Sequence, residues 1–328
     1  MIKYRSVAKR QILATIGAAA MLVCAPMAAK AQATFDQLKL TAPAGPGGGW
    51  DQTAREMQKA MTAAKVAKTV TVTNVPGAGG TIGLAQFVSG KPDPNSLLVS
   101  GMIMVGSIIT NNAAVTLKQV TPIARLTGEW EVILVPASSP HKTLKDLTAA
   151  LKANPGAVSI AGGSAGGTDH ILAGLYAQKV GVDPSKINYI PYSGGGESLA
   201  ALLGAQVAAG VNGYAEMAPH IQTGKLRALA ISSPERVPGI NIPTLKEQGV
   251  DLVLANWRGV VAAPGLQPQQ RDALVQAVTA MAKSPAWQET LKQKDWEDQF
   301  MAGDQFAAFL ETEQTRIAEV LKSIGLAK

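Results

Sequence analysis

The chain has 328 residues, of which 47% are hydrophobic and 16% charged, so it can bury a large core and its length fits two domains. Its formal net charge of +7 is concentrated at the N-terminus, because residues 1–31 hold five basic side chains and no acidic one, and removing them leaves +2. That charge, without a cluster of Lys and Arg, excludes nucleic acid as an expected partner, and the 5% share of aromatic residues argues against a stacking platform for sugars or single strands.

The first segment has the pattern of an export signal. Lys3–Arg10 is basic, Ile12–Val23 is apolar, and A-x-A cleavage sites stand at 29–31 and 31–33. We predict a signal peptide over residues 1–31, with cleavage after residue 31 or 33. The apolar run is too short to span a membrane. The single cysteine, Cys24, lies inside this segment, so we expect no disulfide in the mature chain.

Residues 36–135 read as alternating strands and helices. The expected strands are Leu38–Ala42, Thr69–Val75, Leu97–Ser100 and Val132–Val135. The first expected helix ends near Ala64, and the second begins near Ile82. Strands that alternate with helices predict an α/β domain with a largely parallel sheet.

A second α/β run follows a Pro- and Ser-rich stretch at 136–140. Its expected strands are 158–161, 187–191, 207–211, 226–231 and 257–263. Its expected helices are one that ends at 154 and two that span 168–180 and 197–204. The C-terminal part is helical, and a stripe in the last helix is expected to pack in the core: Phe306, Leu310, Ile317 and Leu321. We infer two similar lobes, 32–135 plus 256–328 and 136–255. Two crossings between them form a hinge, with the ligand in the cleft.

Glycine-rich turns recur between a strand and a helix. They lie at 45–49, 77–80, 162–167 and 193–196. Glycine lets backbone N–H groups approach a ligand closely, and the first turn of a helix leaves N–H groups unpaired at the positive end of its dipole. Phosphate, sulfate and carboxylate all fit such a place. We therefore predict that these turns converge on one acidic ligand.

The glycine turns do not match nucleotide-binding motifs. Ile82 stands where G-x-G-x-x-G needs its third glycine, and no Walker lysine follows any turn. The three histidines lack close mutual spacing and the mature chain holds no cysteine, so we expect neither a metal site nor a cofactor.

A second interpretation comes from residues 162–166, which match G-x-S-x-G between a strand and a helix. This is the pattern of a nucleophile elbow, with Ser164 as the nucleophile of an exported serine hydrolase. The downstream histidines fit poorly, because His170 follows almost at once and His220 has no conspicuous acid before it. In the alternative, Ser164 bonds within a tight turn or contacts ligand.

Several side chains beside the turns have two interpretations. Trp50 packs over the ligand or is a partly buried aromatic, and Asp51 suits a helix cap. Thr168 or Asp169 can cap the next helix, and the Thr hydroxyl can also turn to a ligand carboxylate. Candidates for further hydrogen bonds are Tyr192, Ser193 and Asn212, the last with an ordinary turn as the alternative.

Together these segments resemble a known family. PAGPGGGWDQTAR, PGAGGTIG, GGSAGGTDH, YSGGGES and KLRALAISSPERVPGINIPTLKEQG, in this order, are similar to the Bug/TctC-type extracytoplasmic solute receptors of tripartite tricarboxylate transporters. GGGWDQTAR and ANWRGVVAAPG look closer to the tricarboxylate-binding branch. The resemblance covers nearly all the mature chain. It implies a two-lobed type II periplasmic-binding-protein fold, each lobe a mostly parallel sheet flanked by helices, in a periplasmic protein that is not an enzyme.

The resemblance also implies a ligand and partners. The ligand is a small di- or tricarboxylate, citrate-like by preference, and the partners of this monomer are the membrane permease subunits. A signalling receptor that presents its ligand to a membrane sensor would use the same site. Many relatives have Asp where Asn212 stands, often with amine-bearing ligands, so Asn212 suits a purely anionic ligand.

The expected ligand contacts come from both lobes. In the family, one ligand carboxylate meets the two loops of lobe one, and lobe two closes on it. The first-lobe positions in this chain are Gly47, Gly48, Gly49, Trp50, Asp51, Ala78, Gly79, Gly80 and Thr81. The second-lobe positions are Ser164, Gly166, Gly167, Thr168, Asp169, Tyr192, Ser193, Gly194, Gly195 and Asn212.

Overall fold

The computed structural model describes residues 35–327. The predicted signal peptide, residues 1–31, and its cleavage sites lie outside this range. No helix within residues 35–327 combines the length and the apolar composition that a membrane crossing needs.

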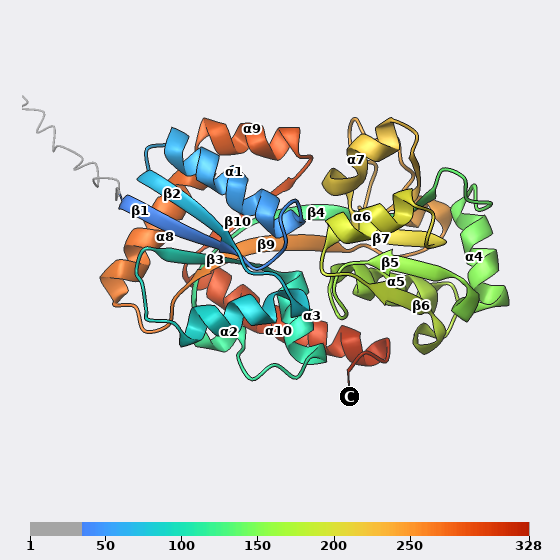
Figure 1. Ribbon diagram of the computed structural model, residues 1–328, viewed down its shortest axis with the longest axis horizontal. Coiled ribbons are helices and arrows are strands. Elements are labelled where there is room, and N and C mark those ends of the chain that lie inside the picture. Colours follow the sequence, from blue (N-terminus) through green and yellow to red (C-terminus); the bar gives the residue numbers. More distant parts are fainter. Residues whose placement is uncertain (1–34, 328) are drawn as a thin grey trace, which may run out of the picture. The chain divides into compact units, whose positions relative to one another are not determined.

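The first lobe takes its elements from both ends of the described chain (Figure 1). Its strands are β1 (Phe35–Ala42), β2 (Ala67–Asn74), β3 (Ser96–Gly101), β9 (Ala255–Ala262), β10 (Glu297–Ala302) and the first part of β4 (Thr121–Pro136). Its helices are α1 (Gly49–Ala63), α2 (Thr81–Ser89), α3 (Met102–Thr110), α8 (Pro268–Ala282), α9 (Pro285–Gln293) and α10 (Asp304–Ser323).

The second lobe, green and yellow in Figure 1, is formed by the middle of the chain. Its strands are the second part of β4, β5 (Ser159–Gly162), β6 (Asn188–Pro191), β7 (Ala209–Gly213) and β8 (Leu226–Ile231). Its helices are α4 (Leu144–Ala153), α5 (Thr168–Lys179), α6 (Gly195–Leu203) and α7 (Tyr214–Gln222).

Strand β4 belongs to both sheets. Its residues up to Trp130 pair antiparallel with β9, and those from Glu131 onward pair with β7 and β8. The strand order is β2-β1-β3-β9-β4-β7-β5-β6, and β8 and β10 also pair with β4. The chain thus enters the second lobe within β4 and returns just before β9. β4 runs without a break from one lobe into the other, so its pairing does not mark a boundary. The predicted lobe boundaries at 135/136 and 255/256 therefore stay a prediction.

Parallel pairing among the described strands occurs away from β4. β1 pairs parallel with β2 and β3, and β5 pairs parallel with β6 and β7, as expected for strands joined by helices. The pairings of β3 with β9 and all those of β4 are antiparallel. The sheets are mixed because the chain reaches β9 from the other lobe and not through a crossover helix on the same sheet.

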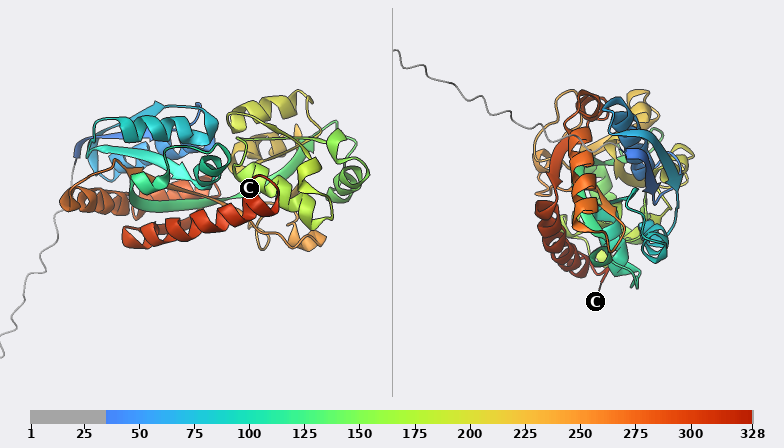
Figure 2. Two further views of the ribbon diagram at one scale, coloured as in Figure 1. Left: turned by 90° about the horizontal axis from the view of Figure 1, so that it is seen from below. Right: turned by 90° about the vertical axis from the view of Figure 1, so that its left-hand side faces the viewer.

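The core follows from side-chain periodicity. Leu38 and Leu40 of β1 point to one face of the sheet and are fully buried, while α1 buries Ala54, Met57 and Met61 at helical spacing. The stripe predicted in the last helix is confirmed as core: Phe306, Leu310, Ile317 and Leu321. The end of α10 also reaches the second lobe (Figure 2), where Gln178 Nε2 of α5 donates to the Ser323 carbonyl oxygen at 3.1 Å.

The sequence does not predict α3, α7, β10 or the first part of β4. β4 carries Glu129 and Glu131 among apolar residues, and both are buried. Such charges interrupt the apolar run that marks a buried strand. α7 contains Pro219 and directly follows Asn212-Gly213, which reads as a turn. These missed elements bring charged side chains to the junction of the lobes.

Candidate functional site

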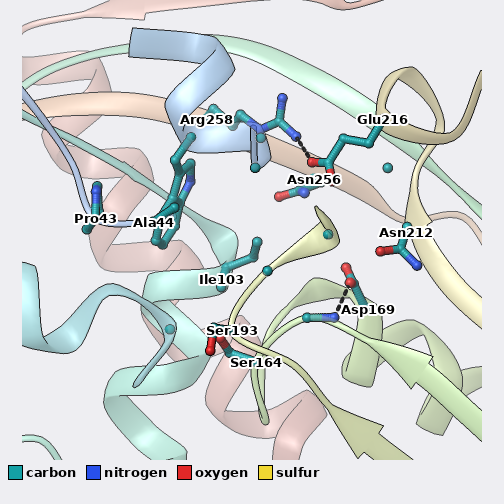
Figure 3. Close-up of a pocket in the computed structure, with 18 residues that line it drawn as sticks. Pro43, Ala44, Ile103, Ser164, Asp169, Ser193, Asn212, Glu216, Asn256 and Arg258 are labelled. Atoms are coloured by element: carbon teal, nitrogen blue, oxygen red, sulfur yellow. Dashed lines mark hydrogen bonds and ion pairs between the residues drawn. The ribbon is translucent and has the colours of Figure 1, made fainter. Parts of the chain in front are cut away.

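A cavity of about 50 Å³ lies where the glycine turns of the two lobes face each other. Figure 3 shows side chains from both lobes around it, with Pro43, Ala44 and Ile103 opposite Asn212 and Glu216. Every one of the predicted glycine turns contributes at least one residue to its lining. The turns therefore converge on one cavity, and their contact with a ligand stays a prediction.

The predicted contact residues divide into two groups. Those that line the cavity are Gly48, Gly49, Trp50, Gly79, Ser164, Asp169, Ser193, Gly194, Gly195 and Asn212. Those that lie in or beside the same turns, outside the lining, are Gly47, Asp51, Ala78, Gly80, Thr81, Gly166, Gly167, Thr168 and Tyr192. The lining also holds residues that are not among the predicted contacts, of which Gly163 lies in a predicted turn and Gly213 follows a predicted contact: Pro43, Ala44, Ile103, Gly163, Gly213, Glu216, Asn256 and Arg258.

Helices α1, α6 and α7 begin at the cavity wall. Their N-cap residues are Gly48, Gly194 and Gly213, which have no side chain to cover the N–H groups of the first turn. At α7, the Ala215 N–H already donates to Glu129 Oε1 at 2.8 Å. The positive ends of α1 and α6 are therefore the helix dipoles through which this cavity can attract an anion.

Asp51 braces the first glycine turn from behind. Its Oδ2 accepts from the Gly47 N–H at 2.8 Å, and it pairs with Arg55 Nε at 3.0 Å. Its Oδ1 also accepts from Asn74 Nδ2 at 2.8 Å. The N-cap of α1 is Gly48, so the prediction that Asp51 caps this helix is wrong. Its role is to fix the loop that presents the α1 N-terminus.

Thr168 and Asp169 do not cap α5 either, because the N-cap of that helix is Gly167. The Thr168 hydroxyl, fully buried, is 3.1 Å from Asn256 Oδ1 of β9 and so links the two lobes. Asp169 Oδ2 accepts from the Gly163 N–H at 2.6 Å and holds the third glycine turn in place.

Trp50 is a buried aromatic of the cavity lining, and its packing over a ligand stays a prediction. It is 4% exposed, and its ring lies where a side chain on Gly80 would have to go. Tyr192 is half-buried and packs against the core of the second lobe. Both residues thus support the wall through packing.

The G-x-S-x-G turn lacks the partners of a nucleophile. No hydrogen bond within residues 35–327 joins Ser164 to a histidine. His170 stacks on Tyr189 with ring centroids 3.9 Å apart, and its Nδ1 accepts from the Gly166 N–H at 3.2 Å. Burial lowers the pKa of His170 to about 4, which makes it a poor general base near neutral pH. The geometry gives Ser164 a place in the wall and no means of activation.

A cluster of ionisable side chains lies beside the cavity, and all are buried except Glu216, whose side chain is 12% exposed. Its members are Arg258 on β9, Glu129 and Glu131 on β4, Asp169 on α5 and Glu216 on α7. Arg258, 2% exposed, forms an ion pair with Glu129 and lies 3.8 Å from Glu216. Among the described residues, no N–H or hydroxyl group donates to either carboxyl oxygen of Glu131, and its hydrogen-bond partner is the carboxyl group of Asp169. Acids thus outnumber the one arginine of the cluster.

Burial raises the pKa of three of these carboxyl groups. The pKa of Glu216 rises to about 8, where the charge of Glu129 adds to the effect of burial and Arg258 opposes it. Burial raises the pKa of Asp169 to about 6, although the bond from Gly163 N–H acts in the other direction. Burial, and then the charge of Asp169, raises the pKa of Glu131 well above its usual range.

Sequence reasoning missed Arg258 and Glu216 for different reasons. Arg258 stands in the apolar run of β9, and a charged residue inside a buried strand is itself a signal, because it needs a buried partner. Glu129 and Glu131 in β4 are the matching signal. Glu216 lies on α7, which the sequence does not predict, and nothing in its neighbours marks it.

Two mixed α/β lobes, joined through β4 and β9 around a cavity of glycine turns, define a two-lobed solute-binding protein of the type II periplasmic class. The family model of the tripartite tricarboxylate transporter family receptor, TctC, matches residues 53–326. The chain belongs to this family. The family consists of receptors, so the chain is a binding protein and not a serine hydrolase.

Curated relatives match along nearly the whole chain. It is 32% identical to the UPF0065 protein in the gbd 5' region of Cupriavidus necator, over 98% of this chain and 99% of that protein. It is 30% identical to protein BugT of Bordetella pertussis, over 88% of this chain and 89% of that one.

Solved structures give the same fold. The periplasmic binding protein BugD superposes with a TM-score of 0.81 at 27% identity, over 89% of this chain and 98% of that one. MatC of Rhodopseudomonas palustris with bound malate has a TM-score of 0.76 at 22% identity, covering 88% of this chain and 99% of that one. R. palustris Rpa4515 with adipate has a TM-score of 0.81 at 21% identity, covering 89% and 98%. At these identities, the last two show the fold alone.

Proposed function

We propose that this protein is exported to the periplasm, captures a small di- or tricarboxylate in the cavity between its lobes, and delivers it to the permease subunits of a tripartite tricarboxylate transporter. A citrate-like acid and the tricarboxylate-binding branch of the family are our preferred assignments. One observation carries the proposal: the glycine N-termini of α1 and α6, one from each lobe, open on the same cavity. We keep the predicted contact residues, and add Arg258, Asn256 and Glu216 to them.

The chemistry of the cavity suits a carrier. Backbone N–H groups at helix ends attract carboxylates without a direct salt bridge, so affinity can be moderate and release possible. The nearest cation, Arg258, is already paired with Glu129. Two proteins of this fold hold malate and adipate, both dicarboxylates, which supports the ligand class.

The size of the cavity supports a closed conformation. A buried water needs roughly 10–15 Å³, so about 50 Å³ accommodates only a few waters or a small polar group. A di- or tricarboxylate therefore enters when the lobes separate at the two crossings, and the lobes close around it to a wider spacing than in this structure. The difference between open and closed lobes gives the permease a surface that reports ligand.

Thermal unfolding of the mature protein with a panel of acids tests the proposal. We expect succinate, malate, adipate or citrate to raise Tm and propionate to leave it unchanged. At a hundred times Kd, binding stabilises by about 2.7 kcal/mol, a shift of roughly 5 °C for a chain of this size. If propionate and the polycarboxylates act alike, or none shifts Tm, the assignment fails.

Asn212→Asp is expected to weaken polycarboxylate binding at least tenfold. Asn212 is 1% exposed, its Nδ2 donates to Ser198 Oγ at 3.1 Å, and its Oδ1 has no partner among the described residues. Because the Ser198 hydroxyl can donate or accept, either end of the amide can face the cavity. A carboxylate there adds a charge of the ligand's own sign in a poorly solvated place. Calorimetric titration gives Kd.

The matched control for that variant is Asn188→Asp, the same substitution at an exposed position of β6 outside the cavity lining. It is expected to bind with wild-type affinity. Equal affinities of Asn212→Asp and wild type would remove the support for a purely anionic ligand at this position.

A further inference from the structure

The carboxyl group of Glu216 occupies the place where helix ends from the two lobes meet (Figure 3). It extends from α7 toward Arg258, whose Nη2 is 3.8 Å from Oε1. A Cβ on Gly49, at the start of α1, would lie 2.7 Å from Oε1, and a Cβ on Gly195, at the start of α6, would overlap Oε2. Glu216 therefore stands between the two dipoles that the proposed function assigns to the ligand.

The charges around Glu216 are mostly negative. The titratable and charged groups that face it are Arg258 on β9, Glu129 and Glu131 on β4, and Asp169 on α5. Arg258 is paired with Glu129 and cannot neutralise a further acid in full. An ionised Glu216 would thus add to the negative charge that an incoming carboxylate meets.

The acids Asp51, in the first turn of α1, and Glu197, in the first turn of α6, are committed to their own turns. Asp51 holds the Gly47 N–H and Arg55, and Glu197 Oε2 accepts from the Ser193 N–H at 3.0 Å. Glu216, by contrast, points one oxygen toward Arg258 and Gly49 and the other toward the start of α6. A neutral carboxyl group is a hydrogen-bond donor as well as an acceptor. Burial raises the pKa of Glu216 to about 8, so the neutral form prevails at neutral pH.

Resting on the carboxylate-binding function proposed above, we propose that Glu216 is a specificity-determining residue: protonated, it donates its O–H to a carboxylate of the ligand, and receptor with ionised Glu216 does not bind. The proton stays on Glu216 in the complex. A receptor molecule whose Glu216 is ionised must therefore take up one proton from solvent before it can bind. Affinity must fall as pH rises through the pKa of this group.

Calorimetric titration of succinate and of citrate at pH 7 and pH 9 tests this, because both acids have lost essentially all their carboxyl protons in this range. With a pKa of about 8, the protonated fraction of Glu216 falls about tenfold between these pH values, so wild-type Kd should rise about tenfold. Glu216→Gln keeps a donor and cannot ionise, so its Kd values at the two pH values should agree within about twofold. At pH 8, wild type should take up about half a proton per ligand and Glu216→Gln none, measured in buffers of different ionisation enthalpy.

Glu235→Gln is the matched control, because Glu235 is an exposed acid of the same lobe outside the cavity lining. It should show the wild-type dependence on pH. A wild-type Kd that is the same at pH 7 and pH 9, or a Glu216→Gln variant that still loses affinity tenfold, would overturn the role of Glu216 alone. If neither protein binds any tested acid at either pH, the carboxylate function fails, and the ligand contact of Glu216 with it.

Thermal unfolding without ligand tests the protonation of Glu216 independently of ligand binding. A raised pKa means that the neutral carboxyl stabilises the fold at pH 5, and that this stability is lost as pH rises through the pKa of about 8. Tm of wild type should therefore fall relative to Tm of Glu216→Gln between pH 5 and pH 8, and the difference should stay constant at higher pH. The acids Glu131 and Asp169 are common to both proteins, and their coupling to Glu216 broadens the pH range of the fall without changing its sign. Parallel Tm curves would show that Glu216 is ionised throughout and would overturn the proposal.

Discussion

Arg258→Met is expected to cause the largest loss of stability of any single substitution at the junction of the lobes, about 3–5 kcal/mol. Arg258 and Glu129 are 2% and 1% exposed, and the guanidinium also lies 5.3 Å from the ring centroid of Trp296. Removing the cation leaves Glu129 as an uncompensated charge in a place that water does not reach. The free energy of unfolding in urea, at pH 7 and without ligand, measures the loss.

Two further variants test whether the loss of stability comes from the buried ion pair. Arg236→Met breaks an exposed ion pair with Glu247, whose side chains are 50% and 43% exposed, and should cost less than about 1 kcal/mol. The double variant Glu129→Gln, Arg258→Met should recover part of the loss, because no unpaired charge remains. If Arg258→Met costs no more than Arg236→Met, the buried pair does not stabilise the junction.

The place of the glycine turns at the cavity could be predicted from the sequence. A strand, a glycine turn and a helix in that order place a helix N-terminus at one edge of a sheet, and this follows from local chemistry alone. For that reason it was predictable that Gly48, Gly194 and Gly195 line the cavity. Which residue of a turn faces the cavity depends on how the turn is held, and Asp51 holds its turn from behind through bonds that the sequence does not reveal.

The cluster of charged residues at the junction of the lobes could not be predicted from the sequence. Arg258 is 129 positions from Glu129 in the chain, and the two meet because β4 and β9 pair antiparallel at the crossing between lobes. Alternation along each strand cannot predict a pairing between strands that are so far apart in the sequence. Arg and Glu inside apolar runs were a sign of such pairing, and weighing them as partners would have located the junction. Glu216 required knowledge of α7, whose Pro219 and preceding turn conceal a helix.

Gly106→Ala is expected to weaken ligand binding by roughly ten- to a hundredfold. Gly106 lies in α3 of the first lobe, and a Cβ on it would fall well inside contact distance of the Gly166 carbonyl oxygen in the second lobe. The same contact brings Thr110 Oγ1 within 3.3 Å of the Ala165 carbonyl oxygen. If the lobes close at this contact, one added methyl group holds them apart, and overpacking of this kind costs about 1–3 kcal/mol. Kd for succinate and citrate at pH 7 measures the effect.

Stability without ligand tells whether this contact belongs to closure or is permanent. Alanine is favoured over glycine inside a helix by roughly 0.5–1 kcal/mol, so α3 itself gains from the substitution. Gly156→Ala, at an exposed position of the second lobe outside the cavity lining where the new Cβ meets only Asn154 Oδ1 at 3.8 Å, is the control and should bind like wild type. Weaker binding by Gly106→Ala with an equal or higher Tm places the contact in the closed state alone. A lower Tm with unchanged Kd would mean that α3 and the turn around Gly166 stay together in both states, and the hinge would then have to move around them.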